Sequence, residues 1–241
     1  MNLNLLVPRP DEFNQKIYGV LVGVVTNNKD PENLGRVKVK LPIRECENET
    51  EWARIATLMA GKEMGCYFLP EVGDEVLVAF HEGEVRRPYV IGALWNNVEK
   101  PPQKNGDGKN NIREIKSRSG HEIIFNDENG KESIEIHTKA GQTIRMEDPA
   151  NGKILVKDQS GNNTLTIDGG GNTVTIKGNL KINLESQSCK INIDAAQNSI
   201  TINAPLQLKL KSQMIDIEAG ANMNIKSGGM MTIQGSLVKI N

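Results

Sequence analysis

Apolar and polar residues alternate along most of the chain, which is the pattern of β-strands with two different faces. In the first hundred residues the alternation falls into five runs, separated by turns rich in glycine, proline and charge. No stretch has the 3.6-residue period of a long helix. Closing short strands into a barrel removes exposed sheet edges, so the pattern predicts a small Greek-key barrel. The five runs are residues 17–26, 35–42, 52–56, 73–80 and 88–96.

After residue 130 the chain repeats one unit, an apolar-x-apolar pair followed by a polar turn. The pairs recur every six to eleven residues, which is typical of a β-solenoid and not of a globular domain. The pairs are Ile134/Ile136, Ile144/Met146, Ile154/Val156, Leu165/Ile167, Val174/Ile176, Leu180/Ile182, Ile191/Ile193, Ile200/Ile202, Leu206/Leu208, Ile215/Ile217, Met223/Ile225, Met231/Ile233 and Val238/Ile240.

The composition changes at the same place as the pattern. Eight of the nine aromatic residues precede residue 100, and only Phe125 lies beyond it. We therefore expect the first part to build a core around its own aromatic side chains. The second part offers two or three medium-sized apolar side chains per repeat, too few for a wide core in a single chain.

A core shared between chains solves this problem. Three chains wound around one axis, each supplying one strand per rung, would fill a narrow interior, with Gly and Asn at corners that need positive φ. The predicted fold class is all-β, with a small closed barrel followed by an intertwined needle of three chains; the family resemblance described below implies that these are an N-terminal OB-fold barrel and a trimeric β-helix. The predicted needle core consists of Ile134, Ile136, Ile144, Ile154, Val156, Ile167, Ile176, Ile193, Ile202, Leu208, Ile217, Ile225 and Ile233.

Four segments follow from these patterns. Residues 1–16 form an N-terminal arm, residues 17–97 the barrel, residues 98–120 a linker and residues 121–241 the needle. The linker contains Pro101, Pro102 and a run of Asn, Gly and Lys, a composition typical of an exposed connector.

Charge and chemistry favour a structural protein. The formal net charge is −1, and no basic block indicates a nucleic-acid or membrane surface. The three cysteines are widely spaced without zinc-ligand spacing, and the three histidines are scattered. No nucleophile elbow, phosphate loop or metalloprotease motif is present. We therefore predict no catalytic residues, no metal and no cofactor.

Several motifs in the first part occur in a recognisable order. Gly35-Arg36-Val37 is followed by Trp52-Ala53-Arg54, then by the run from Phe68 through Pro70-Glu71-Val72-Gly73-Asp74-Glu75-Val76 to Phe80. Pro88-Tyr89-Val90-Ile91-Gly92 and Trp95-Asn96 come next, and Ser119-Gly120-His121-Glu122-Ile123 opens the second part. This order resembles the central spike family of contractile injection machines, which includes the VgrG proteins of type VI secretion and the spikes of contractile-tailed phages.

The resemblance implies a function and a location. It implies a homotrimeric, non-enzymatic spike at the centre of a baseplate, with an OB-fold barrel and a β-helix needle. Such a spike pierces the target envelope and carries a tip or cargo. It is assembled in the bacterial cytoplasm into a phage-tail-like particle or secretion apparatus, and then delivered to the target envelope.

Two partner proteins are expected besides the other chains of the trimer. Because only sixteen residues precede the barrel, we expect a separate hub protein, bound by Leu5, Leu6, Val7 and Phe13 of the arm. Because no histidine follows His137 to build a metal-bound tip, we also expect a PAAR-like tip protein. The residues expected to dock it are Val238, Ile240 and Asn241.

Two other functions fit parts of the pattern. A trimeric fibre or adhesin can also contain a β-helix. An OB-fold can bind single-stranded nucleic acid, and Arg36, Lys38 and Lys40 form a modest basic stripe. The balance of basic and acidic residues makes the nucleic-acid reading the weaker of the two.

Overall fold

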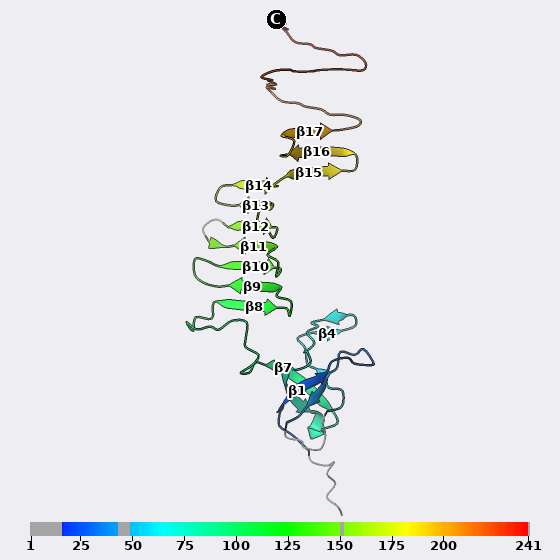
Figure 1. Ribbon diagram of the computed structural model, residues 1–241, viewed down its shortest axis with the longest axis vertical. Helices are drawn as coiled ribbons and strands as arrows, with labels where there is room; N and C mark the ends of the chain where they lie inside the picture. Colours follow the sequence, from blue (N-terminus) through cyan, green and yellow to red (C-terminus); the bar gives the residue numbers. More distant parts are fainter. Residues whose placement is uncertain (1–15, 43–48, 150–151, 241) are drawn as a thin grey trace, which may run out of the picture.

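The computed structural model describes residues 16–42, 49–149 and 152–240. The chain forms a barrel followed by a tall stack of short strands (Figure 1). The strands of the stack lie across its long axis, so that consecutive segments climb away from the barrel. No helix among the described residues is long and apolar enough to span a bilayer.

The barrel is built from five strands in one sheet. Their order is β2-β1-β6-β7-β3, with β3 parallel to β7 and the other neighbours antiparallel. A bridge between Val37 and Ala53, with N···O distances of 3.0 and 2.8 Å, joins the two edges of this sheet and closes it. The strands are β1 (Leu21–Asn27), β2 (Lys38–Lys40), β3 (Arg54–Ile55), β6 (Glu75–Phe80) and β7 (Pro88–Leu94).

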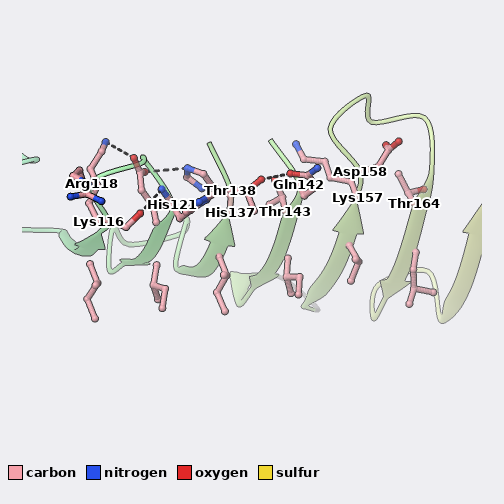
Figure 2. A pocket seen from close by; sticks show the side chains of 18 of the residues that line it. Lys116, Arg118, His121, His137, Thr138, Gln142, Thr143, Lys157, Asp158 and Thr164 are labelled. Atoms are coloured by element: carbon pink, nitrogen blue, oxygen red, sulfur yellow. Dashed lines mark hydrogen bonds and ion pairs between the residues drawn. The ribbon is translucent and has the colours of Figure 1, made fainter. Parts of the chain in front are cut away.

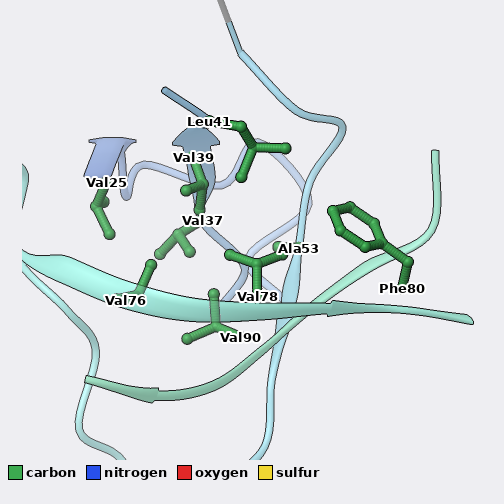
Figure 3. Close-up of a cluster of buried hydrophobic side chains, with 9 residues drawn as sticks. All are labelled: Val25, Val37, Val39, Leu41, Ala53, Val76, Val78, Phe80 and Val90. Carbon is green, nitrogen blue, oxygen red and sulfur yellow. The ribbon is translucent and has the colours of Figure 1, made fainter. Parts of the chain in front are cut away.

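The barrel core is aliphatic, so the expectation of an aromatic core is wrong. Among the described residues, Phe80 is its one aromatic member, whereas Tyr18, Tyr67, Phe68 and Trp95 are exposed. The physical reason is width, because a small closed barrel leaves room only for medium-sized side chains. Figure 3 shows the cluster: Val25, Val37, Val39, Leu41, Ala53, Val76, Val78, Phe80 and Val90.

Two features of the barrel were not expected. A hairpin, β4 (Ala60–Gly61) with β5 (Met64–Gly65), extends from it. A buried ion pair closes the loop between β1 and β2, where both carboxylate oxygens of Asp30 accept hydrogen bonds from the Arg36 guanidinium at 2.8 and 2.9 Å. This pairing, together with three backbone N–H donors, holds the pKa of Asp30 well below its usual range.

Beyond the barrel, seven strands form one antiparallel sheet in which each strand pairs with the next along the chain. The sheet begins with β8, inside the segment that we expected to be linker, so the connector ends at Ile112. The strands are β8 (Ile112–Lys116), β9 (Glu122–Asn126), β10 (Ser133–His137), β11 (Thr143–Glu147), β12 (Lys153–Lys157), β13 (Thr164–Asp168) and β14 (Thr173–Lys177).

A second sheet of three strands follows after a break at residues 178–180. It contains β15 (Lys181–Ser186), β16 (Cys189–Asp194) and β17 (Ser199–Asn203), again paired in chain order. The intertwined arrangement expected from the sequence would pair strands of different chains, and this is wrong for both sheets, because their strands pair within the chain. In contrast, residues 204–240 form no strand and no backbone-to-backbone hydrogen bond among the described residues.

The corners between strands have the predicted residue types. Asn172 has φ of 51° and Asn198 has φ of 49°, and both lie in tight turns between neighbouring strands. Asparagine adopts this left-handed conformation more readily than most residues with a side chain. The high content of asparagine and glycine in the stack therefore reflects its many turns.

Candidate functional site: the apolar face of the sheet

One face of the seven-stranded sheet carries two parallel columns of apolar side chains. The register stacks Ile136 on Ile144 and Ile144 on Val156, while Ile134 stacks on Met146 and Met146 on Ile154. Column A consists of Ile115, Ile123, Ile136, Ile144, Val156, Leu165 and Ile176. Column B consists of Arg113, Phe125, Ile134, Met146, Ile154, Ile167 and Val174.

Both columns are open to solvent in the single chain. Their apolar members are 36–68% exposed, whereas the core residues of the barrel are at most 8% exposed. Leaving regular rows of isoleucine in water is costly, at about 25 cal/mol per Å² of apolar surface. A face of this extent on a soluble protein marks an interaction surface.

The predicted needle-core residues divide into three groups. The first seven lie in the two columns, from Ile134 to Ile176. Ile193 and Ile202 lie on the corresponding face of the second sheet, where Ile191 pairs with Ile202 and Ile193 with Ile200. Leu208, Ile217, Ile225 and Ile233 lie in the unpaired stretch after residue 203 and are 58–69% exposed. Their place in a core remains a prediction.

The other face of the sheet is mainly polar and carries a ladder of ion pairs, with Ile112, Ile124 and Leu155 among its polar residues. His137 lies between two carboxylates, with Nε2 3.1 Å from Glu122 and Nδ1 2.9 Å from Glu135. A hydrogen bond from Lys116 lowers the pKa of Glu122, and the same contact raises the pKa of Lys116. These charges are partly exposed, so each pair contributes little to stability. The two faces therefore differ as the sequence alternation predicts.

A groove of about 1520 Å³ runs along one edge of the sheet and reaches the barrel. All seven residues of column A line it, and Phe68 and Trp95 of the barrel lie at its lower end. Arg118 of the sheet contacts Glu71 of the barrel at 2.9 Å beside this groove. Figure 2 shows the polar side chains of the same edge on one side of the strands, with apolar side chains pointing the other way.

The other sequence-predicted sites are only partly described by the structure. Leu5, Leu6, Val7 and Phe13, the predicted hub-docking residues, lie outside the described residues, as does Asn241. Val238 and Ile240, predicted to dock a tip protein, are 48% and 87% exposed. Both roles remain predictions.

Sequence reasoning placed the start of the repeats too late. Ile115, Ile123 and Phe125 extend the two columns downward to the barrel, although the list of apolar pairs began at Ile134. The missed signal was the alternation of Ile123 and Phe125, which have the same spacing as the later pairs.

Among the described ranges, no group of three or more His, Cys, Asp or Glu side chains is arranged to hold a metal ion. What the geometry provides is an extended apolar face with a groove along column A, and such a surface serves binding.

Comparison with known proteins places the barrel in a family. Residues 21–95 match the family model of the type VI secretion system/phage-baseplate injector OB domain. The matched segment extends from β1 to the residue after β7, so the family domain coincides with the closed barrel.

Longer matches extend into the sheet. The chain is 29% identical over 155 residues to the type VI secretion system spike protein VgrG1c of Pseudomonas aeruginosa, covering 58% of this chain and 21% of that protein. It is 30% identical over 146 residues to VgrG1b of the same organism, covering 54% and 20%. It is 28% identical over 136 residues to VgrG3 of Vibrio cholerae, covering 52% and 13%. The chain thus spans about a fifth or less of the length of these relatives.

Proposed function

We propose that this chain, a VgrG-like chain with the injector OB domain of type VI and phage baseplates, is a homotrimeric, non-enzymatic spike of a contractile injection machine. The observation that carries the proposal is the two-column apolar face that directly follows the injector domain. In such a machine the barrels dock on the baseplate, and the stack of strands points outward as the needle. Sheath contraction then drives the needle through the target envelope.

Three copies suit the exposed face. Three seven-stranded sheets set as the sides of a prism turn both columns of each chain inward, where they cover one another. The interior of this prism is narrow, and Ile, Val, Leu and Met match its width. The ion-pair ladder then lies on the outside of the needle, in contact with water.

The stretch after residue 203 fits the same arrangement with different pairing. Buried backbone N–H and C=O groups need hydrogen-bond partners. Within the chain, the described residues 204–240 form no hydrogen bond between backbone groups. Their alternation continues through Ile215/Ile217, Met223/Ile225 and Met231/Ile233. We assign their pairing to the other two chains, so that the intertwined needle predicted from the sequence is confined to this upper part.

Mass and shape test the proposal directly. Light scattering of the full chain should give three times the chain mass of 26.5 kDa, at all concentrations in the micromolar range. Negative-stain images should show a rod projecting from a wider base. A stable monomer with the same secondary structure content would overturn the proposal, because the apolar face would then have no cover.

The proposed partners are a baseplate hub protein at the barrel end and a PAAR-like tip protein at the needle end. Deleting residues 2–14, which removes Leu5, Leu6, Val7 and Phe13, should release the spike from particles assembled in the bacterial cytoplasm. The trimer should survive this deletion. If the trimer is lost instead, the arm belongs to the trimer and not to the hub contact.

A further inference from the structure

The two edges of the seven-stranded sheet are chemically different. Because the strands pair in chain order, successive turns alternate between the edges (Figure 1). We call the edge formed by residues 116–122, 137–143, 157–164 and 177–181 the basic edge. The opposite edge, residues 126–133, 147–149, 152–153 and 168–173, is the acidic edge.

The charges on the two edges mirror each other. The basic edge has six cations and two carboxylates, and the acidic edge has six carboxylates and two cations. The basic edge carries Lys116, Arg118, Lys139, Lys157, Lys177 and Lys181, with Glu122 and Asp158. The acidic edge carries Asp127, Glu128, Glu132, Glu147, Asp148 and Asp168, with Lys131 and Lys153.

Three of the six cations on the basic edge form ion pairs within the chain. Lys116 pairs with Glu122, Arg118 with Glu71 and Lys181 with Asp194. Among the described residues, Lys139, Lys157 and Lys177 have no ion-pair partner. The edge therefore presents three unpaired cations, one at each of three successive turns.

The acidic edge repeats this arrangement with the opposite sign. Asp127 pairs with Arg113, Glu128 with Lys131 and Glu147 with Arg145. Within the described part of the chain, Glu132, Asp148 and Asp168 have no cationic partner. On each edge, one residue of the less common charge is also outside an ion pair. Asp158 of the basic edge is held by Ser160 and Asn163, and Lys153 lies on the acidic edge.

The groove that contains column A lies along the basic edge. The groove along it is lined by every member of column A, from Ile115 to Ile176, and by no member of column B. Whatever fills this groove must bring apolar side chains bordered by negative charge. The column B side of the same sheet has that character, because Phe125, Ile134 and Met146 lie next to the acidic edge.

We propose that the basic edge of each protomer packs against the acidic edge of the next, with column B of the neighbour seated on the groove. The proposal rests on the homotrimer of the proposed function and names how its protomers meet. Contacts between two different edges are heterologous, and a ring of three closes them without leaving a free edge. The unpaired cations then face unpaired carboxylates at each corner of the prism.

The charges act chiefly on recognition. An exposed ion pair contributes little to affinity, whereas complementary edges steer encounter and exclude wrong pairings. Basic edge against basic edge, or a sheet shifted to bring like charges together, is disfavoured. The apolar columns supply the burial, and the edge charges select which edges meet.

Zero-length cross-linking of the full chain tests the contact. A carbodiimide joins a lysine to a carboxylate only when the two groups touch. The edges of one chain are separated by a five-residue strand, about 16 Å long, so a bond between edges must join two chains. We expect links from Lys139, Lys157 or Lys177 to Glu132, Asp148 or Asp168, found between chains when isotope-labelled and unlabelled protomers are assembled together. A trimer that yields no such link overturns the proposal.

Charge reversal provides the second test. Replacing Lys139, Lys157 and Lys177 by Glu should slow trimer assembly from unfolded chains about tenfold at low salt, with the difference vanishing in 0.5 M salt. Adding Glu132→Lys, Asp148→Lys and Asp168→Lys in the same chain should restore the wild-type rate, because both edges are then reversed. Unchanged assembly of the first variant, or no recovery in the six-fold variant, contradicts the edge pairing.

A matched control separates edge charge from net charge. Lys29, Lys40 and Lys62, exposed residues of the barrel and its hairpin, are replaced by Glu, which changes the net charge by the same amount away from the edges. This control should assemble at the wild-type rate. The two proposals fail differently, since a wild-type monomer in light scattering rejects the trimer itself. A wild-type trimer indifferent to edge charge rejects only the edge pairing.

Discussion

The barrel and the sheet above it are both built from β-strands, but the barrel buries its apolar residues within one chain and the sheet leaves them exposed. In the barrel, strands close on themselves and Val37, Val39, Val76 and Val78 are fully buried within one chain. In the sheet, strands pair just as regularly, but every isoleucine of the two columns stays at least 36% exposed. Backbone pairing alone therefore does not complete a fold. The barrel buries its apolar face within one chain, whereas the sheet leaves its apolar face open, as expected for one wall of the proposed trimer.

The largest expected effect comes from placing a charge on the open wall. Ile144→Asp sets a carboxylate in column A, and in the trimer three carboxylates would share one dry interior. We expect light scattering to show complete loss of the trimer at micromolar concentration, with the barrel still folded.

Thr166→Asp is the matched control for this variant, because Thr166 lies on the polar face of β13 in the same sheet. This variant should remain trimeric. If Ile144→Asp also stays trimeric, the columns are not the contact surface and the comparison between the two regions fails.

A cavity in the barrel should act only on the barrel. Val78→Ala removes two methyl groups from a fully buried position, which we expect to destabilise the barrel by about 2 kcal/mol. Hydrogen exchange should become faster in β1 and β6, while the amides of β10 and β11 keep their protection. Equal acceleration in both regions would show that the two parts unfold as one.

The Asp30–Arg36 pair should make the barrel sensitive to acid. The folded pKa of Asp30 lies below its unfolded value of about 4, so its contribution is present above pH 4 and is lost as pH falls. Asp30→Asn should therefore melt at a lower temperature than the wild type at pH 7. The gap should narrow below pH 4 in thermal denaturation followed by circular dichroism. If the difference in melting temperature does not change with pH, the effect of the substitution comes from altered packing and not from the lost charge.

The smallest effect belongs to the outer ladder of the sheet. Lys116→Gln breaks the pair with Glu122, but the Lys116 side chain is 44% exposed and water screens it. We expect a change of less than about 1 kcal/mol in trimer stability by denaturant titration. A loss as large as that of Val78→Ala would show that the polar face is also buried in the assembly.

The alternation of residue types allowed the faces to be predicted from the sequence, but not the partners of the strands. Ile134/Ile136 and Ile144/Met146 mark one face whether their strands pair within a chain or between chains. The lengths of the turns distinguish these two kinds of pairing. The five residues between Lys116, the last residue of β8, and Glu122, the first residue of β9, are enough for a hairpin that pairs neighbouring strands in the same chain. Counting apolar pairs without weighing turn length led to pairing across chains.

In the barrel, too, the strands could be predicted from the sequence but the packing of the core could not. The strands around Val37 and Val76 were predicted from the pattern of apolar and polar residues, and both are present. The core composition was not, because aromatic content says nothing about which side of a narrow barrel a ring occupies. Phe80 fits at one end of the core, whereas Trp95 lies outside beside the groove. The difference in charge between the two edges could not be seen until the register placed Lys157 and Asp168 at opposite edges of the sheet.

The change in pairing at Asn203 gives the proposed needle an order of construction. Hairpins up to this residue form between neighbours in sequence, and such local contacts form within microseconds in each separate chain. Residues 204–240 must wait for two other chains, a step whose rate depends on protein concentration. Assembly therefore runs from the barrel towards Ile240, and the last surface to exist is the one proposed for the tip protein. A tip protein that binds only this surface would therefore bind only those spikes in which all three chains have assembled up to Ile240.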